Sequence, residues 1–209
     1  MGLKRHADST ATLHPVEPRD YPRDQAGLLA QLGDPDAAVR RWAARDLAAH
    51  PGAATMLCAR LAQERDASVR AVLFSSAAAL GGTAVVQAMV QLLRSEDPAL
   101  RNGAIEVLAH LPAAVAPHID ALLRDGDSDV RIFTVNLLGE LHHPQVPRWL
   151  QQVLERDEAI NVVGAALDVL AEVGGREALP ALHAARRRFA DDDYIAFTAS
   201  LAIERIEAA

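Results

Sequence analysis

Apolar residues recur at helical spacing along most of the chain, in segments separated by short polar turns. Over residues 25–207 this pattern predicts twelve amphipathic helices arranged as six antiparallel pairs. The first helices of the pairs are expected at residues 25–33, 53–65, 83–94, 113–124, 145–156 and 176–189. The second helices are expected at residues 36–50, 67–80, 98–110, 128–141, 158–173 and 192–207.

A short motif marks the start of every second helix. An aspartate stands three residues before an apolar residue, which we call the anchor of the repeat. The copies begin at Asp36, Asp66, Asp97, Asp127, Asp157 and Asp192, and their anchors are Val39, Val69, Leu100, Val130, Ile160 and Ile195. Aspartate at this offset is typical of a helix N-cap, because its carboxylate accepts hydrogen bonds from the free N–H groups of the first turn. The regular period, 30 or 31 residues up to the fifth copy, predicts a stack of similar repeats.

This repeat resembles the HEAT repeat, in particular the short bacterial form of the phycobilisome-lyase HEAT-like family. The resemblance covers residues 25–207 and rests on the sequence Asp-x-x-Val-Arg, or a close variant, that opens the second helices. It implies an all-α fold, a right-handed α-solenoid of six helical-hairpin repeats over residues 25–209. Residues 1–24 are polar, contain three prolines and show no helical period, so they are expected to form a flexible or extended tail.

An arginine follows the anchor in each of the first four copies. In a stack of repeats these arginines would lie within reach of the aspartate of a neighbouring repeat, and the family resemblance also implies such a ladder. The predicted ladder consists of Asp36, Arg40, Asp66, Arg70, Asp97, Arg101, Asp127 and Arg131. The alternative is a basic stripe that binds an anionic ligand. The ladder is favoured because every arginine has an aspartate counterpart.

The outward face of the second helices is less polar than a solvated face. Counted from each anchor, the positions opposite the core are mostly small or apolar in repeats two to five. This indicates a concave apolar groove that holds a helix or peptide of a protein partner. The groove residues are predicted to be Phe74, Ile105, Ile132, Val135, Val162 and Phe197. Phe197 also lies in an apolar stripe of the last helix, which either continues the groove or is covered by the tail or by a second copy in a homodimer.

Composition narrows the function classes. Half of the residues are apolar but only 4% are aromatic, which disfavours β-sheets. The net charge of −7 disfavours a nucleic-acid partner, because phosphate binding requires an excess of lysine and arginine. No apolar run is long enough for a membrane span, and the first residues lack the apolar stretch of a secretory signal. The expected location is therefore cytoplasmic, with no membrane partner.

Candidate chemistry is sparse. Metal binding is not expected, because none of the eight histidines is followed by glutamate, the dipeptide that HEAT-repeat di-iron hydroxylases carry. Cys58 is interpreted as a buried structural thiol. Asp168 occupies a position that is apolar in other second helices. Either a local shift of register explains this, which is the favoured interpretation, or Asp168 is a buried or groove-lining carboxylate. No catalytic arrangement and no cofactor site is predicted.

Together these features predict a non-catalytic adaptor or scaffold, not an enzyme. It would bind a protein partner in the concave groove, in bacterial signalling or complex assembly. The alternative, which follows from the family resemblance, is a bilin lyase-type enzyme or chaperone that acts on a protein bearing a tetrapyrrole. Such proteins handle a tetrapyrrole attached to a light-harvesting subunit.

Overall fold

The computed structural model describes residues 21–208, and these residues contain twelve α-helices and no β-strand. Of the tail predicted over residues 1–24, residues 1–20 lie outside the described part of the chain. The helix pairs are α1 (Gln25–Gln31) and α2 (Ala37–Leu47), α3 (Ala54–Leu61) and α4 (Ala67–Leu80), α5 (Gly82–Leu92) and α6 (Pro98–Ala109), α7 (Pro112–Leu122) and α8 (Ser128–Glu140), α9 (Val146–Arg156) and α10 (Ile160–Val173), and α11 (Leu179–Arg188) and α12 (Asp193–Ala208). Short 3₁₀ turns precede α3 and α11, at Pro51–Ala53 and Arg176–Ala178.

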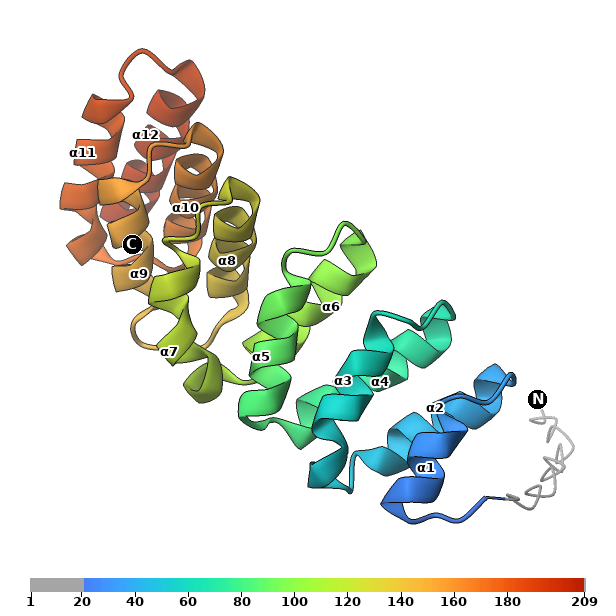
Figure 1. Cartoon of the computed structure of the whole chain (residues 1–209). Helices are drawn as coiled ribbons and strands as arrows, with labels where there is room; N and C mark the ends of the chain where they lie inside the picture. Colours follow the sequence, from blue (N-terminus) through green and yellow to red (C-terminus); the bar gives the residue numbers. More distant parts are fainter. Residues whose placement is uncertain (1–20, 209) are drawn as a thin grey trace, which may run out of the picture.

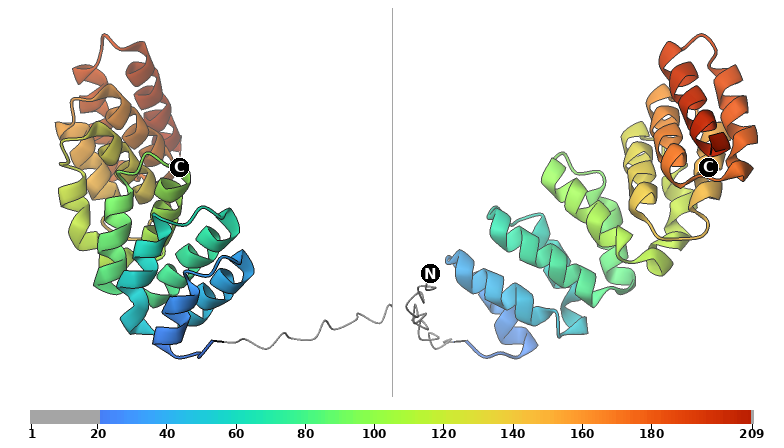
Figure 2. Two further views of the ribbon diagram at one scale, coloured as in Figure 1. Left: turned by 45° about the vertical axis from the view of Figure 1, so that its right-hand side comes forward. Right: turned by 180° about the vertical axis from the view of Figure 1, so that it is seen from behind.

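The six pairs stack in sequence order along a curved path (Figure 1), so that each repeat packs mainly on its neighbours. The second helices, α2, α4, α6, α8, α10 and α12, lie together on one side, which faces the viewer in the right-hand view of Figure 2. We call this side the second-helix face. The turns that join the two helices of each pair follow the inner edge of the curve in Figure 1. The predicted all-α solenoid of helical hairpins is therefore confirmed.

Four of the repeated aspartates are N-caps, as predicted. The side chains of Asp36, Asp66, Asp97 and Asp127 each accept a hydrogen bond, of 2.8 or 2.9 Å, from the backbone N–H two residues further along. Each bond satisfies an N–H group that has no partner within the helix. The carboxylate of Asp192 similarly accepts from the N–H of Ile195 at 2.9 Å.

The fifth repeat departs from the predicted register. Asp157 ends α9, and α10 begins only at Ile160, with Ala159 as its N-cap. The predicted anchor Ile160 is 42% exposed, whereas Val162, three residues after the N-cap Ala159, is fully buried and takes the anchor position. Asp157 stays in the turn because its carboxylate accepts from the N–H of Ala159 and from Arg131. Asp168 is consequently exposed, which confirms the interpretation as a register shift.

Cys58 is buried in α3, as predicted. Burial raises the pKa of its thiol to about 11, because the apolar surroundings disfavour the thiolate. The thiol is therefore protonated at neutral pH and is not a reactive nucleophile.

The repeated arginines close the turn within their own repeat. Each guanidinium donates to the backbone carbonyl six residues earlier, at the end of the turn that follows the first helix. The bonds are Arg40 to Asp34 at 2.8 Å, Arg70 to Glu64 at 2.9 Å, Arg101 to Ser95 at 2.7 Å and Arg131 to Asp125 at 2.8 Å. Carbonyls at the end of a helix lack partners within it, so each arginine satisfies a group that the fold leaves open.

Three of these arginines also reach the next repeat. Arg70 binds the carboxylate of Asp97 and Arg131 binds that of Asp157, each at 2.7 Å. Arg40 binds Glu64 rather than Asp66. Arg101 forms none of the ion pairs found in the described residues. Its guanidinium lies 4.8 Å from the centre of the Phe133 ring instead. Between the third and fourth repeats, the ion pair is formed by Arg94 and Asp125, which lie in the turns that follow α5 and α7.

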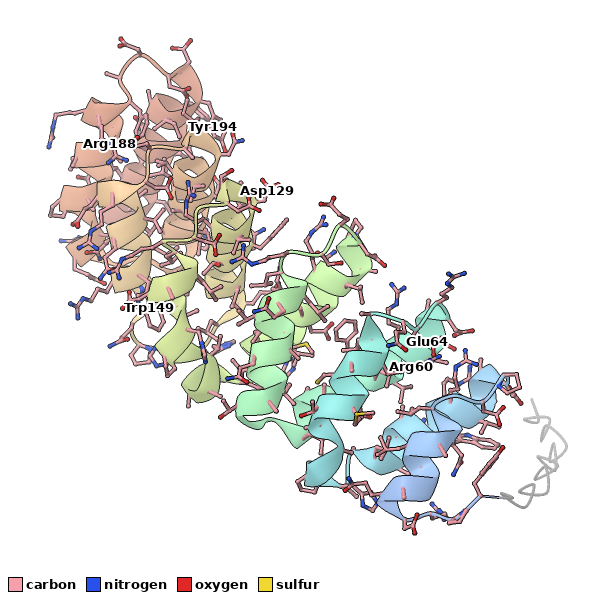
Figure 3. The ribbon with its side chains drawn as sticks, viewed as in Figure 1. Arg60, Glu64, Asp129, Trp149, Arg188 and Tyr194 are labelled. Carbon is pink, nitrogen blue, oxygen red and sulfur yellow. The ribbon has the colours of Figure 1, made fainter. Side chains whose placement is uncertain are left out.

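Glu64 is the most buried of these charged groups, with 2% of its surface exposed. Its carboxylate accepts from Arg40 at 2.8 Å, from Arg60 at 3.0 Å and from the N–H of Asp66 at 2.9 Å; Figure 3 shows Arg60 and Glu64 close together. Burial alone would raise the pKa of Glu64, but the hydrogen bonds and positive charges outweigh it and lower the pKa to about 2.

We expect Glu64→Gln to lower the free energy of unfolding at pH 7 by about 3 kcal/mol, because a buried ion pair loses one partner. The depressed pKa means that the stabilisation by Glu64 is complete above its ordinary pKa of 4.5 and is lost as the pH falls toward 2. The difference between wild type and variant, measured by urea unfolding at several pH values, should therefore shrink across this range. The exposed Glu140→Gln is the control. A difference that stays constant with pH would contradict the assignment.

Asp97 both caps α6 and binds Arg70, and the two roles are separable. Asp97→Ala should cost about 0.5–2 kcal/mol in urea unfolding, because the cap is lost. Asp97→Asn keeps a capping oxygen and loses only the charge, so we expect it to cost less. Asp127→Asn is the matched control, because Asp127 caps α8 without forming an ion pair in the described residues. Unchanged stability of Asp97→Ala would show that the cap does not matter.

Candidate functional site

The structure separates the six predicted groove residues into buried and accessible ones. Val135 and Val162 are fully buried and Ile105 is nearly so. Val162 is buried because it takes the anchor position of the shifted fifth repeat. These three side chains present no surface to a partner. Phe74 and Ile132 are partly buried, and Phe197 on α12 is 68% exposed.

A cleft lies between α4 and α6 on the second-helix face, around Phe74. Its volume is about 560 Å³. The residues that line it are Ala67, Arg70, Ala71, Phe74, Ser75, Ala78, Ala99, Gly103, Glu106, Val107 and His110. We call it the α4–α6 cleft. It runs along both helices, from Arg70 near their N-terminal ends to His110 at the C-terminal end of α6.

The close approach of Phe74 to Gly103 shapes the cleft. A Cβ atom at Gly103 would lie 2.4 Å from Cε2 of the Phe74 ring, so only glycine lets the ring rest against the backbone of α6. The lining also contains Ala71, Ala78 and Ala99, whose short side chains project little into the cleft. The sequence singled out Phe74 but not Gly103; the available signal was a glycine inside a helical pattern, which often has a packing reason.

Polar groups stand at the two ends of the cleft. At one end, Arg70 binds Asp97 and the carbonyl of Glu64. At the other end, Nδ1 of His110 lies 2.7 Å from the carbonyl oxygen of Glu106. When Nδ1 donates this bond, Nε2 of the exposed ring is the acceptor. The cleft therefore combines an aromatic, apolar floor with hydrogen-bonding groups at both ends.

A second hollow, of about 860 Å³, adjoins the cleft across α6, α8 and α10 and shares Glu106 with it. Its lining is acidic, with carboxylates at Glu106, Glu140 and Glu172. Within residues 21–208, no three histidine, cysteine or acidic side chains are grouped so that they would hold a metal ion. None of the helices in this range has the length and apolar character required to cross a bilayer.

The sequence matches the HEAT repeats over residues 26–109 and 115–203, which is most of the chain. The protein therefore belongs to the HEAT-repeat family. In agreement with this, the matched residues comprise the stacked helix pairs described above.

Two relatives have names connected with light-harvesting pigments. The chain is 31% identical over 153 residues to the bilin biosynthesis protein PecE of Mastigocladus laminosus, covering 71% of this chain and 56% of that protein. It thus spans about half the length of PecE. It is also 26% identical over 156 residues to the uncharacterized phycocyanin operon protein Z of Pseudanabaena tenuis, covering 70% of this chain and 77% of that protein. The fold was also compared with the solved complex of CpcE and CpcF, a phycocyanin lyase from a Nostoc species. The match covers 93% of this chain and 99% of the chain in that complex, with 17% sequence identity and a TM-score of 0.36.

These findings correct the expected function. The prediction of a non-catalytic adaptor, and with it the prediction that the protein is not an enzyme, is wrong, because similarity to a bilin biosynthesis protein favours the lyase alternative. The error has a physical origin. The repeating positions report helix capping and packing, which HEAT repeats of every function share. Binding and catalysis depend on side chains that differ between repeats. Because these side chains do not recur at a fixed spacing, a search for repeats does not find them.

A double-mutant cycle tests the contact that shapes the cleft. Gly103→Ala should destabilise the protein by about 1–3 kcal/mol, because the added methyl group overlaps the Phe74 ring. In a Phe74→Ala background the same change should stabilise by about 0.5–1 kcal/mol, because alanine favours a helix over glycine. Urea unfolding of the four variants measures both values. The same sign in both backgrounds would contradict the proposed contact.

Proposed function

We propose that this protein is a bilin lyase-type enzyme or chaperone that acts on a tetrapyrrole-bearing protein. The observation that carries the proposal is the 31% identity with PecE over 153 residues. A bilin is a flat, conjugated linear tetrapyrrole with carboxylate side chains, so its binding site requires an apolar surface, an aromatic contact and a source of positive charge.

The α4–α6 cleft meets these requirements best. Phe74 offers an aromatic face on which a pyrrole ring can stack, and Ala71, Ala78 and Val107 extend the apolar floor. Arg70 at one end uses three of its five N–H groups for Asp97 and the Glu64 carbonyl, so two can still donate to a carboxylate of the pigment. His110 and Glu106 at the other end can form hydrogen bonds with the pyrrole nitrogens.

A protein partner fits the same face. The protein that carries the tetrapyrrole must lie over the mouth of the cleft for the pigment to pass between them. Ile132 on α8, from the predicted groove, is partly accessible and supplies an apolar contact for a helix or peptide of that partner.

Pigment binding is tested with the purified protein and free phycocyanobilin. We expect a shift of the visible absorption band on mixing, because a protein pocket changes the conformation and solvation of the chromophore. Ala71→Glu, which places a charge on the exposed floor without removing a core contact, should weaken binding about tenfold or more. Ala79→Glu is the matched control, because Ala79 is exposed on the same helix outside the cleft. No band shift, or equal binding by both variants, would contradict the assignment of the cleft.

Lyase-type activity requires a second assay. The protein is incubated with phycocyanobilin and apo-phycocyanin subunits, and pigment that remains on the subunits after denaturation in acidic urea is measured by absorption. We expect more covalent pigment than in the reaction without the protein, and less with Ala71→Glu than with Ala79→Glu. If the protein neither accelerates attachment nor alters its product, the proposed activity is wrong even where binding occurs.

A further inference from the structure

A regular array of polar side chains lies on the second-helix face over α6, α8 and α10, which are neighbours in the stack (Figure 2). It consists of the residues six and ten positions after the anchors Leu100, Val130 and Val162. These residues are Glu106 and His110 on α6, Asn136 and Glu140 on α8, and Asp168 and Glu172 on α10, and all six are exposed. Equal distances from the anchor place residues at the same height and on the same side of a helix. The six side chains therefore form two rows across three helices, which we call the acidic grid.

The grid surrounds the hollow of about 860 Å³ that adjoins the α4–α6 cleft. Ile105 and Val169 form the apolar part of its lining. Its polar lining consists of the side chains of Asn102, Glu106, Asn136, Glu140 and Glu172. All five can accept a hydrogen bond, and only the two amides can also donate one. The hollow therefore suits a ligand that supplies N–H donors and positive charge.

The four carboxylates of the grid are not neutralised within the described residues, since none of the ion pairs found there involves them. The arginines of α6 and α8 are Arg101 and Arg131, and α10 contains no lysine or arginine. Both arginines donate to carbonyls of the turns at the inner edge, and neither lines the hollow. Arg205 on the adjoining α12 does not line it either. The negative charge of the grid is thus open to an external partner.

The end of the grid on α10 carries a cost for the helix. Asp168 and Glu172 are like charges four residues apart, an arrangement that destabilises a helix. The carboxylate of Asp168 accepts a hydrogen bond from the Tyr194 hydroxyl at 3.4 Å, which leaves the charge in place. Departures from a local rule of this kind are expected where a surface serves a function. A cationic partner would relieve this repulsion.

The spacing of the rows indicates the form of the partner. Helices that pack side by side lie about 8–10 Å apart, so neighbouring side chains of one row have about this spacing. Along an α-helix, residues seven positions apart lie on one face and are separated by about 10.5 Å. In a β-strand, residues on one face are separated by about 7 or 13 Å, which matches less well. The rows therefore fit a helix that crosses α6, α8 and α10 and carries a basic residue in every second turn.

We propose that the acidic grid docks an α-helix of a protein partner that has lysines or arginines along one face. Complementary charge of this kind speeds association and fixes the register of the two surfaces. The hollow shares Glu106 with the α4–α6 cleft, so the docked helix lies beside the cleft. That the partner is the tetrapyrrole-bearing protein rests on the proposed function, whereas the binding of a basic helix does not.

A labelled synthetic helix tests the proposal by fluorescence anisotropy. The peptide has about 20 residues, long enough for a helix in water, and consists of alanine and glutamine with six arginines in two rows on one face. A second peptide has the same composition, with the arginines distributed evenly around the helix. At low ionic strength the one-faced peptide should bind about fivefold more tightly, and added salt should weaken its binding because the ion pairs are exposed. Equal affinity for both peptides, or binding of neither, would overturn the proposal.

Charge removal locates the docking site. Glu140→Gln/Glu172→Gln removes two charges from the grid with little change in size, and should weaken binding of the one-faced peptide about tenfold. Glu96→Gln/Glu155→Gln is the matched control, because both residues are exposed and neither lines the hollow. Circular dichroism verifies that both double variants remain folded. An equal loss in the control would show that net charge alone attracts the peptide, and the grid would not be the docking site.

The peptide assay contains no pigment, so its outcome is distinguishable from that of the proposed function. Peptide binding by a wild-type protein that gives no band shift with phycocyanobilin would support the docking site and contradict the pigment site. A band shift without peptide binding would contradict the docking site alone.

Discussion

A stack of short helix pairs is held together only by contacts between neighbours, so each junction must be specified locally. Here the arginine after the anchor meets this constraint. It satisfies an open carbonyl in its own turn, and in three repeats it also reaches a carboxylate of the next repeat. One side chain therefore fixes both the angle within a repeat and the distance to its neighbour. The apolar core supplies most of the stability, and these bonds along the inner edge orient the repeats.

The sequence predicts the helices well because capping and amphipathic spacing are local. Asp36, Asp66, Asp97 and Asp127 stand where the structure uses them. The predicted helix start in the fifth repeat is wrong for a non-local reason. Arg131 of the preceding repeat holds Asp157 in the turn, so the helix starts later. Glu64 also escaped prediction, because its four hydrogen-bond donors come from two different repeats and the turn between the helices.

The sequence predicts the candidate site less well than it predicts the helices. Phe74 was found from its place on the outward face, but the cleft exists because Gly103 on the next repeat has no side chain. A glycine that opens a cleft because it has no side chain is hard to recognise from a hydrophobic pattern. The same pattern wrongly assigned Ile105 and Val135 to a groove, since a face turned away from the core of one repeat becomes the contact with the next. It wrongly assigned Val162 because the register of α10 is shifted. The helical period alone does not distinguish an exposed surface from a contact between two repeats.

The α4–α6 cleft has a mechanical consequence. A chain of repeats bends most easily where adjacent units share the least surface, and the cleft removes such surface between the second and third repeats. A bend at this point would move the first two repeats relative to the remaining four. A molecule that fills the cleft would contact the second and the third repeat together, and its presence would restrict such a bend.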